Sequence, residues 1–380
     1  TGSGTGSGRE RDDSLEYVPC SELDYDYRTW SDQEIAVYVP DGAVSGNVMI
    51  ETDRGRSNAV YFEVASPSGT KRFERRKGYQ IQHDIRVSNL DEVEGSEGLE
   101  LWVPRLTGGY TQQSIEESHD PEPMWEDYQG VMRYHIAATE PWVETVLSHT
   151  YWFDRYSIST DIVPESLPSE YDTDRNLYER YTSAGPYIPS DDQWHIDVAR
   201  RVVGRNSSPY YMARAIYRYL IDRLEVDESA SVTLREALES RTCPASDYGL
   251  LFVTLARAVG IPARPVAGYI VHGDKLTQRH IWAEYYLPHY GWVPVDPAFG
   301  DGIGFISMPV EDSGEFYFGN MDNQHITFSR HVVEIPKINP HSGTKTVSPP
   351  FGLQTIWEEY PAGNDDYRAG WNDIRVIDWW

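Results

Sequence analysis

RTCPASDYGLLFVTLARAVGIPAR, residues 241–264, and HIWAEYYLPHYGWVPVDP, residues 280–297, are the two stretches that decide the fold. The apolar run over 250–259 is closed by Gly260 and followed by Ile261-Pro262, which together form a helix stop signal. We predict that this helix begins near Pro244 and that strands follow at 265–271, 281–287 and 292–295. Helices followed by an antiparallel sheet indicate an α+β domain.

These two stretches carry most of the parts of a thiol acyl-transfer site. Such chemistry needs a thiolate at a helix N-terminus, a histidine that accepts and returns its proton, and a carboxylate that orients the histidine. The helix N–H groups would also bind the oxyanion. His280 and Asp296 lie on consecutive predicted strands joined by a turn at 289–291, so antiparallel pairing is expected to bring them side by side.

The order and identity of the residues in both stretches resemble the transglutaminase-like superfamily, whose core is papain-like. Its nucleophile motif reads roughly G-x-C-x-D-Y-A-x-L-F, then R-A-x-G-I-P-A-R, and its second motif reads H-x-W-x-E-x-Y-x-P-x-x-G-W-x-x-x-D-P. The residues that match without a gap are Asp247, Tyr248, Gly249, Leu251, Phe252, Arg257, Gly260, Pro262, Arg264, His280, Trp282, Glu284, Tyr286, Pro288, Gly291, Trp292, Asp296 and Pro297. Segments 99–181 and 316–330 also resemble prokaryotic members. The resemblance implies acyl transfer from a glutamine carboxamide or peptide amide to an amine or water, on a protein or peptide substrate, without a cofactor.

One position departs from this pattern, because the gap-free match puts Ala245 where the nucleophilic cysteine is expected. Cys243 falls on the preceding glycine, and two residues along a helix rise by about 3 Å and rotate by about 200°. Cys243 would therefore face away, although loop geometry before Pro244 leaves it as an alternative nucleophile. Ala245 is either an introduced inactivating substitution or the mark of a natural pseudoenzyme. As written, the chain is expected to bind a substrate rather than turn it over. A peptidase or amidase of the same fold and a non-catalytic binding module are the alternatives.

The remaining candidates are weaker. Trp282 would either flank the acyl pocket or pack in a core. Three other histidines, His272, His289 and His325, are expected at the surface or in the core rather than in catalysis, and Asp322 in a solvated loop. Neither a CxxC…HxxxH spacing nor an EF-hand loop is present, so no metal is predicted. Cys20 and Cys243 do not make a disulfide framework, and a bridge between them is left open.

Composition limits the partners of the 380-residue chain. Its net charge of −27 disfavours nucleic acid and anionic membranes and would attract amine-rich substrates. Only five of its 33 basic residues are lysine, a balance that suggests adaptation to salt. No apolar run is long enough for a membrane span. The TGSGTGSG start and the Asn206-Ser207-Ser208 sequon favour an extracellular or surface-anchored protein, with the cytoplasm left open.

Period-two runs such as Ile81, His83, Ile85 and Val87 predict an antiparallel β-sandwich before the helical region. We therefore expect an N-terminal antiparallel β-sandwich followed by a papain-like transglutaminase core. The predicted boundaries are a flexible linker or cloning remnant at 1–12, the sandwich and its connector at 13–190, the core at 191–335 and a surface tail at 336–380.

Overall fold

The computed structural model describes residues 17–380 apart from 66–67, 91–97, 126, 138–142, 274, 304–309 and 364. The predicted linker at 1–12 lies outside the described residues. None of the helices formed by the described residues is long and apolar enough to span a membrane.

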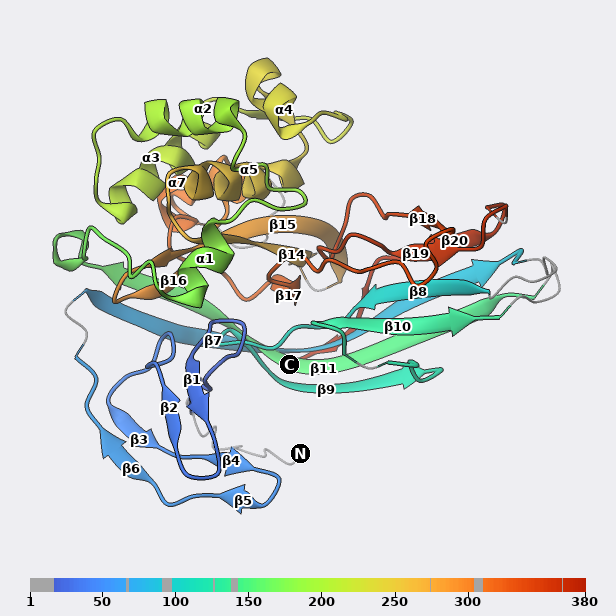
Figure 1. The fold of residues 1–380 in the computed structure, drawn as a ribbon, viewed down its shortest axis with the longest axis horizontal. Coiled ribbons are helices and arrows are strands. Elements are labelled where there is room, and N and C mark those ends of the chain that lie inside the picture. The colour runs from blue at the N-terminus through green and yellow to red at the C-terminus, as the bar shows by residue number, and fades with distance from the viewer. Residues whose placement is uncertain are drawn as a thin grey trace, which may run out of the picture.

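Two antiparallel sheets form the predicted sandwich (Figure 1). The longer sheet is built on β7 (Gly69–Ser88) and β11 (Thr145–Ile162), with β9 (Gln112–Asp120) beside β11. The shorter sheet contains β8 (Leu99–Pro104) and β10 (Val131–Ile136). A cluster of buried apolar side chains from β7, β8, β10 and β11 fills the space between the sheets. Ile81, His83, Ile85 and Val87 are all buried, as their period-two spacing predicts.

The predicted transglutaminase-like core follows, with helices on one face of a four-stranded antiparallel sheet (Figure 1). The strands, in the spatial order β16-β15-β14-β17, are β16 (Gly291–Val295), β15 (Leu276–Leu287), β14 (Ala263–His272) and β17 (His325–Ser329). The helices on this face are α2 (Gln193–Val203), α3 (Pro209–Ile221), α4 (Leu234–Ser240) and α5 (Ala245–Ala258). Helix α1 (Asn176–Thr182) instead buries Leu177 and Tyr181 in the cluster that contains Trp292. Helix α5 is the central one: ten of its residues are buried, and it packs on β15.

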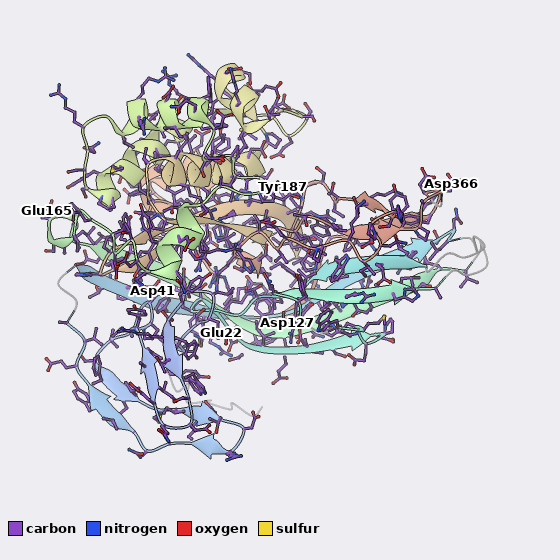
Figure 2. The ribbon with its side chains drawn as sticks, in the orientation of Figure 1. Glu22, Asp41, Asp127, Glu165, Tyr187 and Asp366 are labelled. Atoms are coloured by element: carbon purple, nitrogen blue, oxygen red, sulfur yellow. The ribbon has the colours of Figure 1, made fainter. Side chains whose placement is uncertain are left out.

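Residues 17–65 differ from the sandwich predicted for 13–190. They form three separate two-stranded ribbons at one side of the molecule, drawn in blue in Figure 1. The ribbon strands are β1 (Tyr27–Trp30), β2 (Ile35–Val37), β3 (Gly46–Val48), β4 (Glu51–Thr52), β5 (Gly55–Arg56) and β6 (Val60–Phe62). Strands this short bury little surface, and most of their side chains are exposed. Asp41, labelled in Figure 2, attaches this region to the core. Its Oδ2 accepts from the Trp292 N–H at 3.0 Å.

The C-terminal segment also differs from the predicted surface tail. Strands β20 (Arg368–Trp371) and β21 (Arg375–Trp379) extend the sheet of β7, and β19 (Glu358–Tyr360) links β8 to β18 (Gly343–Lys345). Phe351 and Trp357 are fully buried. The segment is therefore an integral part of the sandwich, whose backbone edges it covers.

A buried ion cluster ties these parts together around Arg264. The Arg264 guanidinium is fully buried, pairs with both Asp24 and Glu284, and lies 3.9 Å from the centre of the Trp292 ring. Tyr110, from the sandwich region, donates its hydroxyl to Glu284 Oε1 at 2.5 Å. Two residues of the family motifs, Arg264 and Glu284, therefore act as structural links between the N-terminal region, the sandwich and the core.

Candidate active site

The N-terminal end of α5 positions residue 245. Ala245 is the first residue of the helix and is only 3% exposed. Gly249, one turn later on the same helix face, lies so close to β15 that an added Cβ would be 2.7 Å from the carbonyl oxygen of Ile281. This face of α5 is therefore directed at β15, beside the residue that follows His280.

His280 and Asp296 are hydrogen-bonded to each other, as the strand pattern predicts. The distance from His280 Nε2 to Asp296 Oδ2 is 2.8 Å, and both side chains are buried. Asp296 follows β16 and caps the short helix α6 (Pro297–Gly300), because its Oδ1 accepts from the Phe299 N–H at 3.1 Å. With Nε2 held by the carboxylate, Nδ1 is the ring atom left to exchange a proton with a group at position 245. The catalytic role of the pair stays a prediction.

A second histidine, His325, completes this cluster and lies in the core, one of the two places expected from the sequence. His325 begins β17, and its Nε2 lies 3.2 Å from the same Asp296 Oδ2. Its Nδ1 lies 2.8 Å from Asp322 Oδ1. Asp322 is buried rather than solvated, and it accepts the Tyr317 hydroxyl at 2.9 Å. The one signal in the sequence was the Asp322–His325 spacing of three residues, which is too common to be diagnostic.

The charges in this cluster stabilise one another. Burial opposes ionisation of Asp296, but the charges and hydrogen bonds of His280 and His325 hold its pKa below the usual range. Burial disfavours the charged form of His325, yet Asp322 and Asp296 raise its pKa to about 9. His325 is therefore an imidazolium at neutral pH, held between two carboxylates.

Cys243 lies in a different environment. It is fully buried in the two-residue strand β13 (Thr242–Cys243), which pairs with β12 (Glu225–Val226). Burial, followed by the charges of Asp247 and Glu228, raises the pKa of its thiol to about 12. A thiol with this pKa is almost entirely protonated at neutral pH and is a poor nucleophile. Cys20 and Cys243 are both free, so the bridge left open by the sequence is not formed.

Glu228 is a residue that the sequence analysis missed. Its Oε1 accepts a long hydrogen bond, 3.4 Å, from the backbone N–H of Ala245. That N–H belongs to the group of helix amides expected to bind the oxyanion. Glu228 comes from the loop before α4, 17 residues earlier, so no local pattern relates it to the site.

Aromatic rings enclose the histidine pair. The Trp282 ring stacks on His280 at a centroid distance of 6.3 Å and meets His325 edge-on at 5.1 Å. Phe299 lies 5.2 Å from His280 on a centroid basis. Trp282 is 2% exposed, so it packs in a core and borders the candidate site at once. His280 and Ala245 are also nearly inaccessible to solvent.

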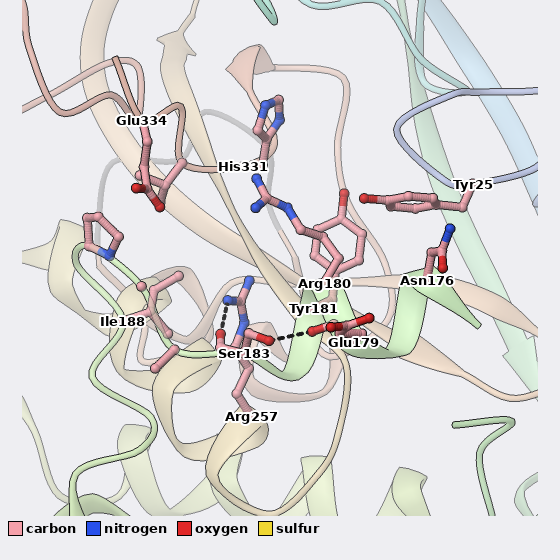
Figure 3. Close-up of a pocket in the computed structure, with 14 residues that line it drawn as sticks. Tyr25, Asn176, Glu179, Arg180, Tyr181, Ser183, Ile188, Arg257, His331 and Glu334 are labelled. Atoms are coloured by element: carbon pink, nitrogen blue, oxygen red, sulfur yellow. Dashed lines mark hydrogen bonds between the residues drawn. The ribbon is translucent and has the colours of Figure 1, made fainter. Parts of the chain in front are cut away.

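A cavity of about 390 Å³ lies at the opposite end of α5 (Figure 3). It is lined by Arg180, Tyr181, His331 and, in the last turn of α5, Arg257, which donates to the Ser183 carbonyl. Arg257 lies twelve positions after Ala245 in α5, which corresponds to about 18 Å along the helix axis. This cavity is therefore separate from the candidate active site. His289, another histidine considered in the sequence, is exposed in the β15–β16 turn and lies outside both.

A buried helix N-terminus that packs beside a strand bearing a hydrogen-bonded histidine–aspartate pair is the arrangement of papain-like acyl-transfer folds. Comparison with known proteins agrees with this class, since residues 196–297 match the transglutaminase-like superfamily. An uncharacterized protein of Haemophilus influenzae is 27% identical over 186 residues, which cover 40% of this chain and 50% of that protein. A protein-glutamine gamma-glutamyltransferase of Pseudomonas aeruginosa is 35% identical over 72 residues, 16% of this chain and 10% of the enzyme.

Among solved structures, a candidate cysteine protease of Cytophaga hutchinsonii aligns with a TM-score of 0.49 and 14% identity, covering 82% of this chain and 91% of that one. The chain spans half or less of the length of the curated relatives it matches. Residues 196–297 of this chain therefore form a transglutaminase-like core.

Proposed function

We propose that residues 245, 280 and 296 form an acyl-transfer site of the transglutaminase type, which alanine at position 245 leaves without its nucleophile. The observation that carries this proposal is the 2.8 Å contact from His280 Nε2 to Asp296 Oδ2, next to the α5 face that bears Ala245. As written, the chain would bind an acyl donor without turning it over.

With cysteine at position 245, each side chain has a defined step. His280 Nδ1 takes the thiol proton, and the thiolate attacks the carbonyl carbon of a glutamine carboxamide. The resulting oxyanion collapses to a thioester and expels ammonia, which receives the proton from His280. Asp296 keeps the His280 ring in the required tautomer and stabilises its imidazolium form.

The second half of the reaction separates two candidate activities. A primary amine that attacks the thioester gives transfer, whereas water gives hydrolysis, as in an amidase or peptidase. Transfer is favoured by the named activity of the Pseudomonas aeruginosa relative and by the net charge of −27, which attracts cationic amines. The substrate class would then be a protein or peptide that offers glutamine, with a lysine-like amine as acceptor. An extracellular or surface-anchored location is part of the same proposal.

The test is to restore the thiol with Ala245→Cys. The variant is mixed with a glutamine-containing peptide and a fluorescent primary amine, and ammonia release, amine incorporation and the thioester mass are measured. We expect a thioester and ammonia from A245C, and neither from the original chain nor from A245C combined with His280→Ala. Amine incorporation supports transfer, and ammonia release without incorporation supports hydrolysis. Absence of a thioester from folded A245C, or acylation at Cys243, would overturn the proposal.

A further inference from the structure

Three buried side chains converge on one point in the core. Among the described residues, His280, Asp296 and His325 are the group whose candidate ligand atoms all lie within 4.8 Å of one another. We propose that they form a binding site for a divalent cation of the zinc class, with a water molecule as its fourth ligand. This inference shares side chains with the proposed function but does not rest on it.

Two of the three ligand pairs lie near the spacing of a tetrahedral metal site, and the third pair lies within 4.8 Å. His280 Nε2 and His325 Nε2 lie 2.8 Å and 3.2 Å from the same Asp296 Oδ2. Ligands bonded to zinc at about 2.1 Å in a tetrahedron are about 3.4 Å apart. Each of these two pairs therefore needs to separate by only about 0.2–0.6 Å to admit the ion. Two histidines and one carboxylate also form a donor set typical of zinc sites that keep an open position.

The surrounding hydrogen bonds hold the ligands in the required orientation. His325 Nδ1 is paired with Asp322 Oδ1 at 2.8 Å, which leaves Nε2 as the ligand atom. Asp322 is fixed in turn by the Tyr317 hydroxyl and by the Gln324 N–H, at 2.9 Å and 2.8 Å. A carboxylate behind a ligating histidine is the usual outer partner of a zinc ligand. Asp296 Oδ1 is occupied by the Phe299 N–H, so Oδ2 is the oxygen available to the ion.

Position 245 lies on the other side of the His280 ring from the ion. It is on the face of α5 that packs against β15, next to the segment that carries His280. A group there would meet His280 Nδ1, whereas the ion would be bound at Nε2. A metal would also give the His280–Asp296 pair a use in a chain that has no nucleophile.

The experiment is titration of the full-length, chelator-treated chain with Zn²⁺ by calorimetry and with Co²⁺ by visible absorption, in excess Mg²⁺ to mask weak sites on the acidic surface. We expect one ion per chain and the intense visible bands of tetrahedral Co²⁺. His325→Gln should weaken binding at least a hundredfold and Asp322→Asn by about 10- to 100-fold. The exposed His289→Gln is the matched control and should bind like the original chain.

Ala245→Cys reports where the ion lies. Because the thiol would lie beyond His280 Nδ1 and the ion would be bound at Nε2, Co²⁺-loaded A245C should show no thiolate-to-cobalt charge-transfer band in the near ultraviolet. Three results would each overturn the proposal: no stoichiometric site, equal binding by folded H325Q and H289Q, or such a band in Co²⁺-loaded A245C. Acyl transfer by metal-free A245C is measured separately, so the failure of either proposal is recognised independently of the other.

Discussion

Glu284→Gln is expected to destabilise the protein strongly, although it changes neither the size nor the shape of a side chain. Glu284 is buried between the Arg264 guanidinium and the Tyr110 hydroxyl. Burial raises the pKa of this carboxyl, but the charges of Arg264 and Arg330 outweigh burial and lower it from 4.5 to about 2. A difference of roughly 2.5 pKa units corresponds to about 3 kcal/mol of folding free energy. Removal of one partner from a buried ion pair costs a similar 3–5 kcal/mol or so.

The sign of the pH dependence follows from the lowered pKa. Because the carboxyl is more acidic in the folded protein, its stabilisation is complete above its unfolded-state pKa of about 4.5 and disappears as the pH falls towards 2. Glutamine mimics the protonated acid, so the original chain and E284Q should differ by about 3 kcal/mol at pH 7. The difference should shrink steadily below pH 4.5.

Urea unfolding followed by tryptophan fluorescence at pH 7 and at pH 3 measures this difference. The exposed Glu311→Gln is the control and should match the original chain at both pH values. If E284Q were as stable as E311Q at pH 7, the Arg264 cluster would not hold the parts of the chain together as we argue. An equally large deficit at both pH values would show that packing, and not charge, is responsible.

Three further predictions concern the candidate site and the sheet that carries it. Glu228→Gln in the A245C background should raise the rate of thioester formation several-fold in stopped-flow assays. The substitution removes a negative charge next to the amide that would bind the oxyanion. An unchanged rate would place the oxyanion elsewhere. Cys243 in the original chain should resist iodoacetamide until the protein unfolds, because its buried thiol has a raised pKa of about 12; rapid labelling of native protein, followed by mass spectrometry, would contradict this. Gly268→Ala should lower the free energy of unfolding, measured by urea titration, by about 1–3 kcal/mol. The added Cβ would lie 1.9 Å from the Ile326 carbonyl oxygen and push β17 away. A free energy of unfolding equal to that of the original chain would refute the close approach.

The sequence predicted the elements whose signals are local. The stop signal at Gly260 marks the end of α5 to within two residues, and the three strands expected after it appear as β14, β15 and β16. Because the turn between β15 and β16 is short, the proximity of His280 and Asp296 could also be inferred from spacing alone.

The parts that sequence reasoning missed depend on contacts between distant segments. Strand β20 pairs with β7 in a register that joins Gly370 to Arg86, and nothing in the Pro- and Gly-rich tail specifies a partner so far away. His325 reaches Asp296 from β17, with β14 lying between β17 and β15 in the sheet. The spacing of 29 residues between them matches no short metal or catalytic motif.

The structure also changes what the retained His280–Asp296 pair implies. From sequence alone, a site that has lost its nucleophile has no reason to keep this pair, so its presence argues for recent activity. Yet Asp296 has two further structural tasks, since it caps α6 and holds His325 on β17. Replacing it with alanine would leave a buried imidazolium with one carboxylate fewer and a helix without its cap, a loss larger than that expected for His280→Ala. Retention of Asp296 is therefore explained by stability, and retention of His280 is the stronger evidence for chemistry or metal binding at this site.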